Sequence, residues 1–407
     1  MPPTAPLPAA ADARTLVLGL SLAQLISWGS ALYSFAVFVE PVEAALDLTR
    51  GQISLAYSVA LLAEGLAAFA AGRWIDAGHE RAVMTGGSLL VGFGLLAQGE
   101  VSTLAGFYAV WVLIGLGMAG TLYPPVFAVV TRRFPHSYRR AIITITFLGG
   151  LASTVFIPLS AALIGLWGWR AASWTLGVIN LAVCVPLHGW LLRGAPGPVM
   201  AASRAPSAAA EQRAALSAHL RGPVFWRLGV FIVLLMAVNA AVPPHLVSLL
   251  RESGLPVAWV VALPASIGAL QVLGRLVLYA GERRLDVHAA NRWTPALIPL
   301  ALAVLLAGSG HSGAALLFAL LYGLGNGLLT IVRGTVMAQY VSAAYVGALN
   351  GALGLPLALS RAAAPLAVGL LWTPAHGYAW SLALLLAISV LGVAALWSGQ
   401  RRAARAA

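Results

Sequence analysis

The chain has 407 residues, of which 60% are hydrophobic and only 9% are charged. Soluble domains carry about 25% charged residues, so the composition excludes a soluble protein. The formal net charge of +12 comes from 24 basic residues, all of them arginine. Most of these arginines fall in one set of loops, so a membrane environment explains them and no nucleic-acid partner is expected.

Long uncharged runs follow one another along the chain, and a helix needs about 20 apolar residues to cross the hydrocarbon. Two runs are too long for one helix, and turn residues break each of them, GSGHSG at 308–313 and TPAHG at 373–377. The expected fold is an all-α integral membrane protein. Twelve membrane-spanning helices are predicted, over 15–38, 52–72, 82–99, 104–130, 140–164, 171–192, 225–249, 257–280, 293–308, 314–338, 347–371 and 378–397.

The arginines separate the two sides of the membrane. The N-terminus, the loops after even-numbered helices and the C-terminus hold 18 of the 24, whereas the opposite loops hold Arg50, Arg170 and Arg251. Because cytoplasmic loops are enriched in arginine, both termini are expected in the cytoplasm, in a multi-pass protein of the bacterial cytoplasmic (inner) membrane. The N-terminal stretch lacks the basic region of a cleavable signal peptide, so the first helix is expected to remain as a span.

The halves of the chain resemble each other at a spacing of about 208 residues. GLGMAG from Gly115 matches GLGNGL from Gly323, and TVFIPLSA (154–161) matches RAAAPLAV (361–368). A Gly- and Pro-containing stretch, 194–224, separates an N-terminal six-helix bundle (1–193) from a C-terminal one (225–407). Two similar halves are typical of secondary transporters that bind substrate near the midplane between the halves, and a monomer is expected.

The stretch GRWIDAGHER after the second predicted helix resembles the loop signature of the major facilitator superfamily, G-x-x-x-D-x-G-x-x-R. Gly72, Asp76, Gly78 and Arg81 meet this pattern. The resemblance implies a twelve-helix major facilitator fold, in which this loop acts as a gating motif that latches the outward-facing state. The alternative is an ordinary turn between two helices on the arginine-rich side.

Several shorter stretches resemble the bacterial monocarboxylate-porter and oxalate–formate-antiporter relatives within that superfamily. They are WGSALYSFAVF (28–38), TRRFPHSYRRAII (131–143), GWRAAS (168–173) and GALQVLGRL (268–276). In those relatives, basic residues on the eighth and eleventh helices bind the substrate carboxylate, and Arg275 and Arg361 fall on these positions. A guanidinium can bind a carboxylate through two parallel hydrogen bonds.

Arg275 and Arg361 lie inside predicted helices, where a charge costs about 2.5–3.5 kcal/mol and normally faces a cavity or a partner. The alternative to substrate binding is that each caps backbone carbonyls or pairs with an acid, and Glu64 is the acidic residue deep in a predicted helix. Arg333 is a further substrate candidate, although it lies closer to the cytoplasmic end, where snorkelling or an ion pair would also suit it.

Glu64 and His245 are candidate proton carriers for coupling, because histidine titrates near neutrality and His245 follows the prolines of AVPP. The proton-linked relatives carry a basic residue in the first helix and an acid one turn before the arginine of the eighth. This chain has neither, and Gln271 stands in the second place. Exchange against a counter-substrate and efflux therefore remain open beside proton coupling.

Trp28, Tyr33 and Tyr123 lie in the middle of the first and fourth predicted helices, where the wall of a substrate cavity would run. Plain packing between helices is the alternative for each. Pro124 and Pro125 follow Tyr123 and remove backbone donors, so a bend is expected there.

No enzyme is indicated, because the sequence has no P-loop, a single cysteine and no metal-ligand spacing. No catalytic residue, metal or cofactor is expected. The predicted function is secondary active transport of a small organic anion, a mono- or dicarboxylate, by alternating access, with a proton or a counter-substrate as coupling species. The alternative of the same fold is an efflux carrier for drugs or for oxyanions such as arsenicals. A transporter-like sensor without flux is the alternative from another class.

Overall fold

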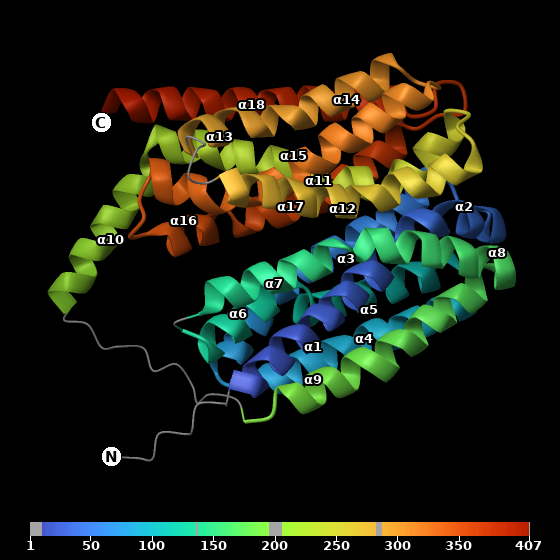
Figure 1. Ribbon diagram of the computed structural model, residues 1–407, viewed down its shortest axis with the longest axis horizontal. Coiled ribbons are helices and arrows are strands. Elements are labelled where there is room, and N and C mark those ends of the chain that lie inside the picture. Colours follow the sequence, from blue (N-terminus) through green and yellow to red (C-terminus); the bar gives the residue numbers. More distant parts are fainter. Residues whose placement is uncertain (1–9, 136, 195–205, 282–286, 407) are drawn as a thin grey trace.

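The computed structural model of the chain describes residues 10–135, 137–194, 206–281 and 287–406. Figure 1 shows two bundles of long, roughly parallel helices, with the N-terminal half of the chain in one and the C-terminal half in the other. The described starts and ends of the chain, at α1 and α18, lie at the same end of the bundles. This arrangement agrees with an even number of crossings.

The first span is helical throughout and contains a short π-helical turn. The fourth span is interrupted at Leu122, whose backbone is extended. The interruption directly precedes the Tyr-Pro-Pro sequence, as expected from the two prolines. The helical elements of the N-terminal bundle are α1 (Ala10–Trp28), η1 (Gly29–Tyr33), α2 (Phe35–Leu46), α3 (Arg50–Asp76), α4 (Glu80–Glu100), α5 (Leu104–Thr121), α6 (Tyr123–Arg133), α7 (Tyr138–Gly150), α8 (Ala152–Ile179), η2 (Asn180–Cys184) and α9 (Val185–Leu191).

Helix α8 contains the predicted boundary between the fifth and sixth spans. Gly168 has φ 79° and ψ 166°, a conformation that glycine adopts without steric cost. Directly after this kink, Nη1 of Arg170 donates to the carbonyls of Gly99 and Val101, at 2.7 and 2.9 Å, and caps the end of α4. The turn between the two spans is therefore fastened to the neighbouring hairpin.

The C-terminal bundle follows a connecting helix within the predicted linker. This helix, α10, covers Pro206–Arg221, and the beginning of the linker (195–205) lies outside the described residues. The helical elements of the bundle are α11 (Pro223–Glu252), α12 (Val257–Gly281), α13 (Val287–Trp293), η3 (Thr294–Ala296), α14 (Leu297–Ala307), α15 (Ser312–Tyr340), α16 (Val346–Ala352), α17 (Gly354–Leu371) and α18 (Ala379–Ala406).

Twelve spans can be counted in the described residues. Ten helical stretches are long and apolar enough to cross a membrane; one of these, Tyr138–Leu191, has 54 residues and contains the Gly168 kink, so it crosses twice. A shorter apolar helix, Asn291–Ala307, supplies the remaining crossing. The predicted all-α membrane fold is confirmed.

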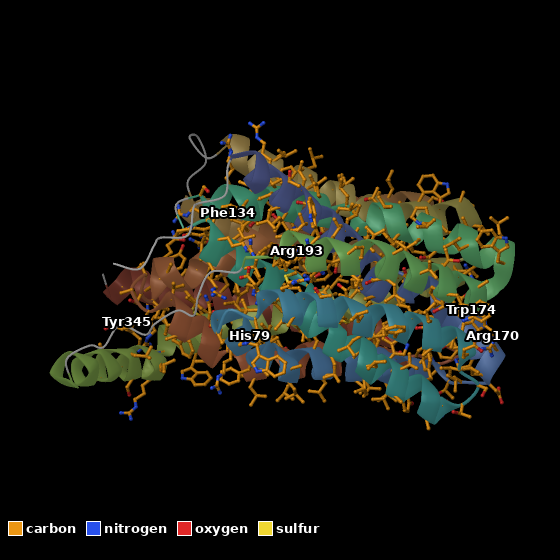
Figure 2. All side chains as sticks on the ribbon, turned by 90° about the horizontal axis from the view of Figure 1, so that it is seen from below. His79, Phe134, Arg170, Trp174, Arg193 and Tyr345 are labelled. Carbon is orange, nitrogen blue, oxygen red and sulfur yellow. The ribbon has the colours of Figure 1, made fainter. Side chains whose placement is uncertain are left out.

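The loops also alternate between two ends, as the positions of labelled side chains show (Figure 2). His79, Phe134 and Tyr345 follow the second, fourth and tenth spans and lie toward one end, whereas Arg170 lies at the other. The arginine-rich and arginine-poor loops of the sequence therefore lie at opposite ends of the molecule.

The internal repeat is visible in how its glycines pack. A Cβ on Gly115 of α5 would lie 2.2 Å from the backbone oxygen of Ala60 in α3, and a Cβ on Gly323 of α15 would lie 2.6 Å from the Cβ of Leu270 in α12. The glycines two residues later face α4 and α14, respectively. The fourth span thus packs on the second and third as the tenth packs on the eighth and ninth.

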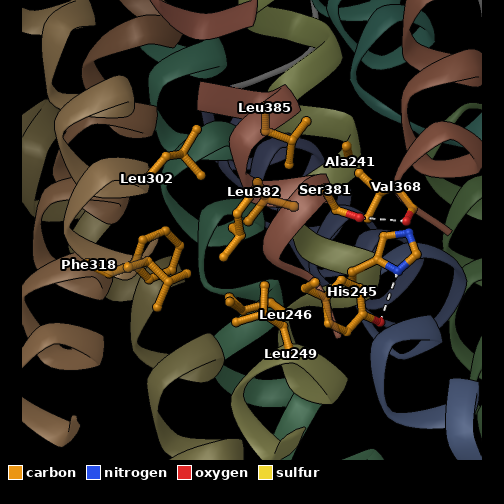
Figure 3. Close-up of a pocket in the computed structure, with 13 residues that line it drawn as sticks. Ala241, His245, Leu246, Leu249, Leu302, Phe318, Val368, Ser381, Leu382 and Leu385 are labelled. Atoms are coloured by element: carbon orange, nitrogen blue, oxygen red, sulfur yellow. Dashed lines mark hydrogen bonds between the residues drawn. The ribbon is translucent and has the colours of Figure 1, made fainter. Parts of the chain in front are cut away.

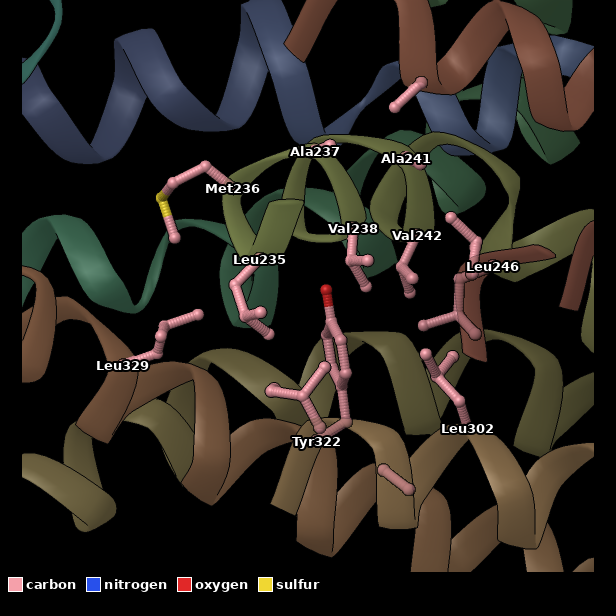
Figure 4. Packing of buried hydrophobic residues seen from close by; sticks show 14 of the residues in the cluster. Leu235, Met236, Ala237, Val238, Ala241, Val242, Leu246, Leu302, Tyr322 and Leu329 are labelled. Atoms are coloured by element: carbon pink, nitrogen blue, oxygen red, sulfur yellow. The ribbon is translucent and has the colours of Figure 1, made fainter. Parts of the chain in front are cut away.

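Each bundle has its own apolar core. In the C-terminal bundle, Val238 and Val242 of α11 face α15, and the fully buried ring of Tyr322 points between them (Figure 4). Its hydroxyl lies 3.5 Å from the Asn239 side-chain oxygen. Between the bundles, α17 packs on α3 and α8 packs on α12. These two pairs of helices form the boundary at which the candidate residues meet.

Replacement of Gly115 by alanine should destabilise the fold, because the added methyl meets backbone atoms of Ala60 that cannot turn away. Overpacking of this kind costs about 1–3 kcal/mol. Thermal unfolding of the purified protein in detergent measures the effect. Gly86→Ala in α4 is the matched control, since nothing lies within 4 Å of a Cβ there. Equal melting temperatures for the two variants would contradict the close approach of α5 to α3.

Candidate functional site

An ion pair joins the two bundles midway along α3 and α17. Arg361 of α17 donates from Nη2 to Oε2 of Glu64 in α3, at 3.2 Å. The Glu64 side chain is 7% exposed and the Arg361 side chain is 26% exposed. The substrate candidate Arg361 and the coupling candidate Glu64 therefore contact each other. In this conformation Arg361 pairs with an acid, which was the alternative to substrate binding.

Thr154, the repeat counterpart of Arg361, makes the matching contact between the other two helices. Its hydroxyl donates to the carbonyl of Ala265 at 2.7 Å and accepts from the N–H of Ala269 at 3.1 Å, so it ties α8 to α12. Both repeat positions thus reach the opposite bundle. Of the two, the C-terminal position carries a charge, and its acidic partner offsets that charge.

Arg275 of α12 reaches the N-terminal bundle at the end of α7. Its Nη1 donates to the carbonyl of Thr146 at 2.9 Å and lies 3.5 Å from where a Cβ on Gly150 would be. Its Nε is shielded from solvent and has no acceptor among the described residues. No carboxylate in the described part of the chain pairs with this guanidinium. Unlike Arg361, it therefore keeps a charge that the described residues do not offset.

The three aromatic candidates lie together, next to Arg275. The Trp28 ring lies 6.3 Å from the Tyr33 ring and 4.8 Å from the Tyr123 ring, between centroids. The Tyr123 hydroxyl lies 2.7 Å from where a Cβ on Gly149 would be, one residue before the glycine that Arg275 contacts. Tyr33 lies beside Arg275 and the buried Gln271 of α12. Side chains from both bundles thus assemble one aromatic and cationic cluster.

Arg333 of α15 is exposed, and the hydrogen-bond acceptor beside its guanidinium is not an acid. Its Nη1 lies 3.4 Å from the Met236 sulfur of α11, which is a weak acceptor. The Arg361 charge acts on it electrostatically. Arg333 thus contacts its own bundle and adds positive potential near Arg361.

His245 lies elsewhere, inside the C-terminal bundle. Helix α11 continues through Pro243 and Pro244, and the imidazole is 2% exposed. Its Nε2 lies 3.0 Å from the Pro365 carbonyl and its Nδ1 lies 3.4 Å from the Tyr378 hydroxyl. It borders a small apolar cavity enclosed by α11, α14, α15, α17 and α18 (Figure 3). Both ring nitrogens lie beside residues of the C-terminal bundle, and neither of these residues belongs to the Arg275 cluster.

A network centred on Arg50 closes the boundary between the bundles at the arginine-poor end. Arg50 at the start of α3 donates from Nε to Glu43 at 2.6 Å and from Nη1 to Glu252 of the C-terminal bundle at 3.1 Å. The guanidinium also contacts the Tyr378 hydroxyl and lies over the Trp372 ring, 4.8 Å from its centroid. The buried Arg50 side chain is therefore held by charges and rings from both bundles.

A second ion pair at the same end joins Arg251 of α11 to Glu40 of α2. Arg50, Arg170 and Arg251, the three arginines of the arginine-poor loops, thus each have a structural partner. The sequence analysis missed this network. These three arginines lie in loops that otherwise lack arginine, and that was the signal that could have identified them.

The gating motif lies at the opposite end. Asp76 is the last residue of α3, and Gly78 has φ 92° in the turn that follows. Asp76 and Arg81 are exposed, and neither forms an ion pair within the described residues. Nothing lies within 4 Å of a Cβ at Gly72. The motif therefore forms the predicted turn without a latch contact in this conformation.

Glu80 within the same stretch is a residue that the sequence analysis passed over. It is fully buried and pairs with Arg133 of α6, at 2.5 Å, and with Arg132, at 3.7 Å. The two arginines belong to the quoted stretch after the fourth predicted helix. The two loop motifs thus bind each other and hold the ends of α4 and α6 together.

The pair between Arg361 and Glu64 should show a measurable coupling free energy. Arg361→Ala leaves the buried Glu64 carboxylate without its partner, which should cost about 3 kcal/mol, the lower end for a broken buried pair because Arg361 is partly exposed. The double variant Arg361→Ala/Glu64→Gln should recover part of that loss. Denaturant unfolding of the four proteins of the cycle in detergent checks this, with Arg401→Ala as an exposed control. Additive losses would contradict the contact.

The profile of the family described as the Major Facilitator Superfamily matches residues 20–307. An MFS-type transporter of Bacillus subtilis, YcxA, is 23% identical over 379 residues, which are 90% of each chain.

Solved structures with the same fold include an inward-facing, occupied bacterial homologue of the human lysosomal transporter Spinster, with TM-score 0.76, 15% identity and coverage of 97% of this chain and 98% of that one. The nucleoside transporter NupG of known structure gives TM-score 0.70 at 14% identity, covering 95% and 98%. The human organic anion transporter MFSD10 gives 0.64 at 19%, covering 96% and 100%. The chain belongs to the Major Facilitator Superfamily.

Proposed function

We propose that this secondary transporter moves a small organic anion, and that Arg275 is the residue that anchors it. The observation that carries the proposal is the position of Arg275. Its guanidinium lies where side chains of both bundles meet, beside three aromatic rings, with one buried N–H that has no acceptor among the described residues. A carboxylate placed there would receive a charge-assisted hydrogen bond.

The charges inside the spans support an anion over a cation. Arg275, Arg333 and Arg361 contribute three positive charges, and Glu64 contributes one negative charge that is already paired. A charge within the membrane is costly unless a partner offsets it. An anionic ligand would lower that cost, whereas a cationic drug would need a free carboxylate and would raise it.

The pair of Arg361 and Glu64 supports a role in coupling. Protonation of Glu64 would release the guanidinium, and so would a substrate carboxylate that replaces Glu64 on Arg361. Because the pair joins α3 to α17, either event would weaken the contact between the bundles. A proton and a counter-substrate are both compatible with this site. His245 fits coupling less well, since it lies with Tyr378 at the Arg50 network.

The proposed orientation follows from the arginines. With the arginine-rich loops in the cytoplasm, both termini and the linker face the cytoplasm of a bacterial inner membrane, and the Arg50 network lies on the outer side. The bundles, proposed as 1–193 and 225–407 of a monomer, are then closed toward the outside. An exposed Asp76 without a latch contact agrees with an inward-facing state.

An efflux carrier for oxyanions is the second candidate, because guanidinium groups serve carboxylate and oxyanion alike. In this case an oxyanion such as arsenate would compete with a carboxylate for the same guanidinium. Counterflow of each in proteoliposomes separates the two candidates, and absence of flux for every anion would favour a sensor.

Arg275→Ala should abolish carboxylate counterflow in proteoliposomes, because the anchoring charge and its fork of N–H donors are both lost. Arg275→Lys should retain a small part of the activity, since lysine keeps the charge without the bidentate geometry. Arg401→Ala at the exposed end of α18 is the control and should transport normally. Normal exchange by Arg275→Ala would refute the proposed anchor.

Arg50→Ala should open the outer side, because it removes the contacts of one guanidinium to both bundles. Spin labels at Ser102 and His311, in exposed loops of the two bundles at that end, report the separation in a Cys184→Ser background. The distance distribution should shift to longer values than in the parent protein. An unchanged distribution would show that Arg50 does not hold the outer side closed.

A further inference from the structure

The Arg275 guanidinium has two different edges. Nη1 is occupied by the Thr146 carbonyl of the N-terminal bundle, whereas Nε has no acceptor among the described residues. In a guanidinium, Nε and the other terminal nitrogen form the edge that holds a carboxylate with two parallel hydrogen bonds. The Thr146 contact therefore fixes the side chain by one nitrogen. The Tyr123 hydroxyl is a hydrogen-bond partner of the guanidinium, and Nε is the N–H left without an acceptor among the described residues.

A single carboxylate suffices for this edge. The second arginine on the bundle boundary, Arg361, is already offset by Glu64 at 3.2 Å. A dianion that used both arginines would have to displace an internal carboxylate, whereas a monoanion on Arg275 displaces none. The charges of the described residues therefore favour one negative charge on the ligand.

Aromatic side chains gather near Arg275. Trp28 packs on Tyr123 at 4.8 Å between centroids, and Phe127 stacks on Tyr123 at 5.3 Å with 14° between the planes. Trp28 is oriented by a hydrogen bond from Nε1 to Gln24, at 3.2 Å. All three rings are partly exposed, although they lie within spans. They form a fixed set of ring faces and edges next to a cation.

We propose that the ligand is a monocarboxylate with a flat, aromatic body, held with its carboxylate on Arg275 and its ring against Trp28 and Tyr123. This inference rests on the proposed function and narrows its substrate class. Aromatic contacts add to the burial of apolar area, and each such pair is worth about 2- to 12-fold in affinity. A saturated ring of the same size would bury a similar area without that gain.

The experiment compares benzoate with cyclohexanecarboxylate, which has the same charge and nearly the same size but no π-system. Binding to the full chain in nanodiscs is measured by isothermal titration calorimetry, together with acetate and succinate. Benzoate should bind at least about 5-fold more tightly than cyclohexanecarboxylate. Acetate and the dianion succinate should bind more weakly than both.

Three variants locate the effect. Trp28→Phe keeps a ring and should retain the preference for benzoate, whereas Trp28→Leu should reduce it to near unity. Arg275→Gln should remove the binding of all four ligands. Thermal unfolding reports whether the variants are folded, and if Trp28→Leu is not, the ligand comparison on the unmodified chain decides alone.

Three outcomes would overturn the inference. Equal affinity for benzoate and cyclohexanecarboxylate, or tightest binding of succinate, would refute the flat monoanion and leave the proposed transport of organic anions intact. Absence of binding and of counterflow for every carboxylate would remove the proposed function as well.

Discussion

The cost of a charge inside the membrane is the constraint on which the rest of this structure depends. Four charged side chains, those of Arg275, Arg333, Arg361 and Glu64, lie within spans, Arg333 nearest to the end of its helix. Each costs several kcal/mol unless it finds a partner. Arg275, Arg361 and Glu64 lie at the boundary between the bundles, where each contacts the opposite bundle. A contact that offsets such a charge therefore also joins the two halves, which links binding to the relative position of the bundles.

The two arginines of the boundary solve this problem in different ways. Arg361 forms an ion pair with Glu64 of α3. Its repeat counterpart Thr154 needs no acid, because its hydroxyl hydrogen-bonds to the backbone of α12. Arg275 donates a hydrogen bond to a backbone carbonyl of α7, and no acid among the described residues pairs with its charge. In the proposed function, the first position acts as a switch and the second holds the anion. The pseudo-symmetric fold thus carries an asymmetric site.

The closed end of the molecule uses the same chemistry for another purpose. Arg50 gathers carboxylates from both bundles, with Trp372 and Tyr378 around it. Ion pairs of this kind can form and break as the bundles move, because water reaches their components when the end opens. An apolar contact depends on neither charge nor hydrogen-bond geometry, so it would align the two bundles less specifically. Closure at this end therefore rests on a few named side chains.

Much of this could be predicted from the sequence because it depends on local pattern. The twelve spans, the breaks at 308–313 and 373–377 and the bend before Pro124 follow from hydrophobic length and from glycine and proline. Family membership followed from short motifs and a matching profile. The arginine bias indicated which loops share an end of the molecule.

Side-chain partners could not be predicted in this way. That Arg361 pairs with Glu64, 297 positions earlier in the chain, depends on how α3 and α17 face each other. The convergence of Trp28, Tyr123 and Arg275 likewise depends on the rotation of helices from both bundles. The sequence by itself determined which segments enter the membrane and which charged residues those segments contain, because the free energy of moving each residue from water into the membrane depends on its type. Only the tertiary structure decided which charges meet, because pairing needs distances that no local pattern encodes.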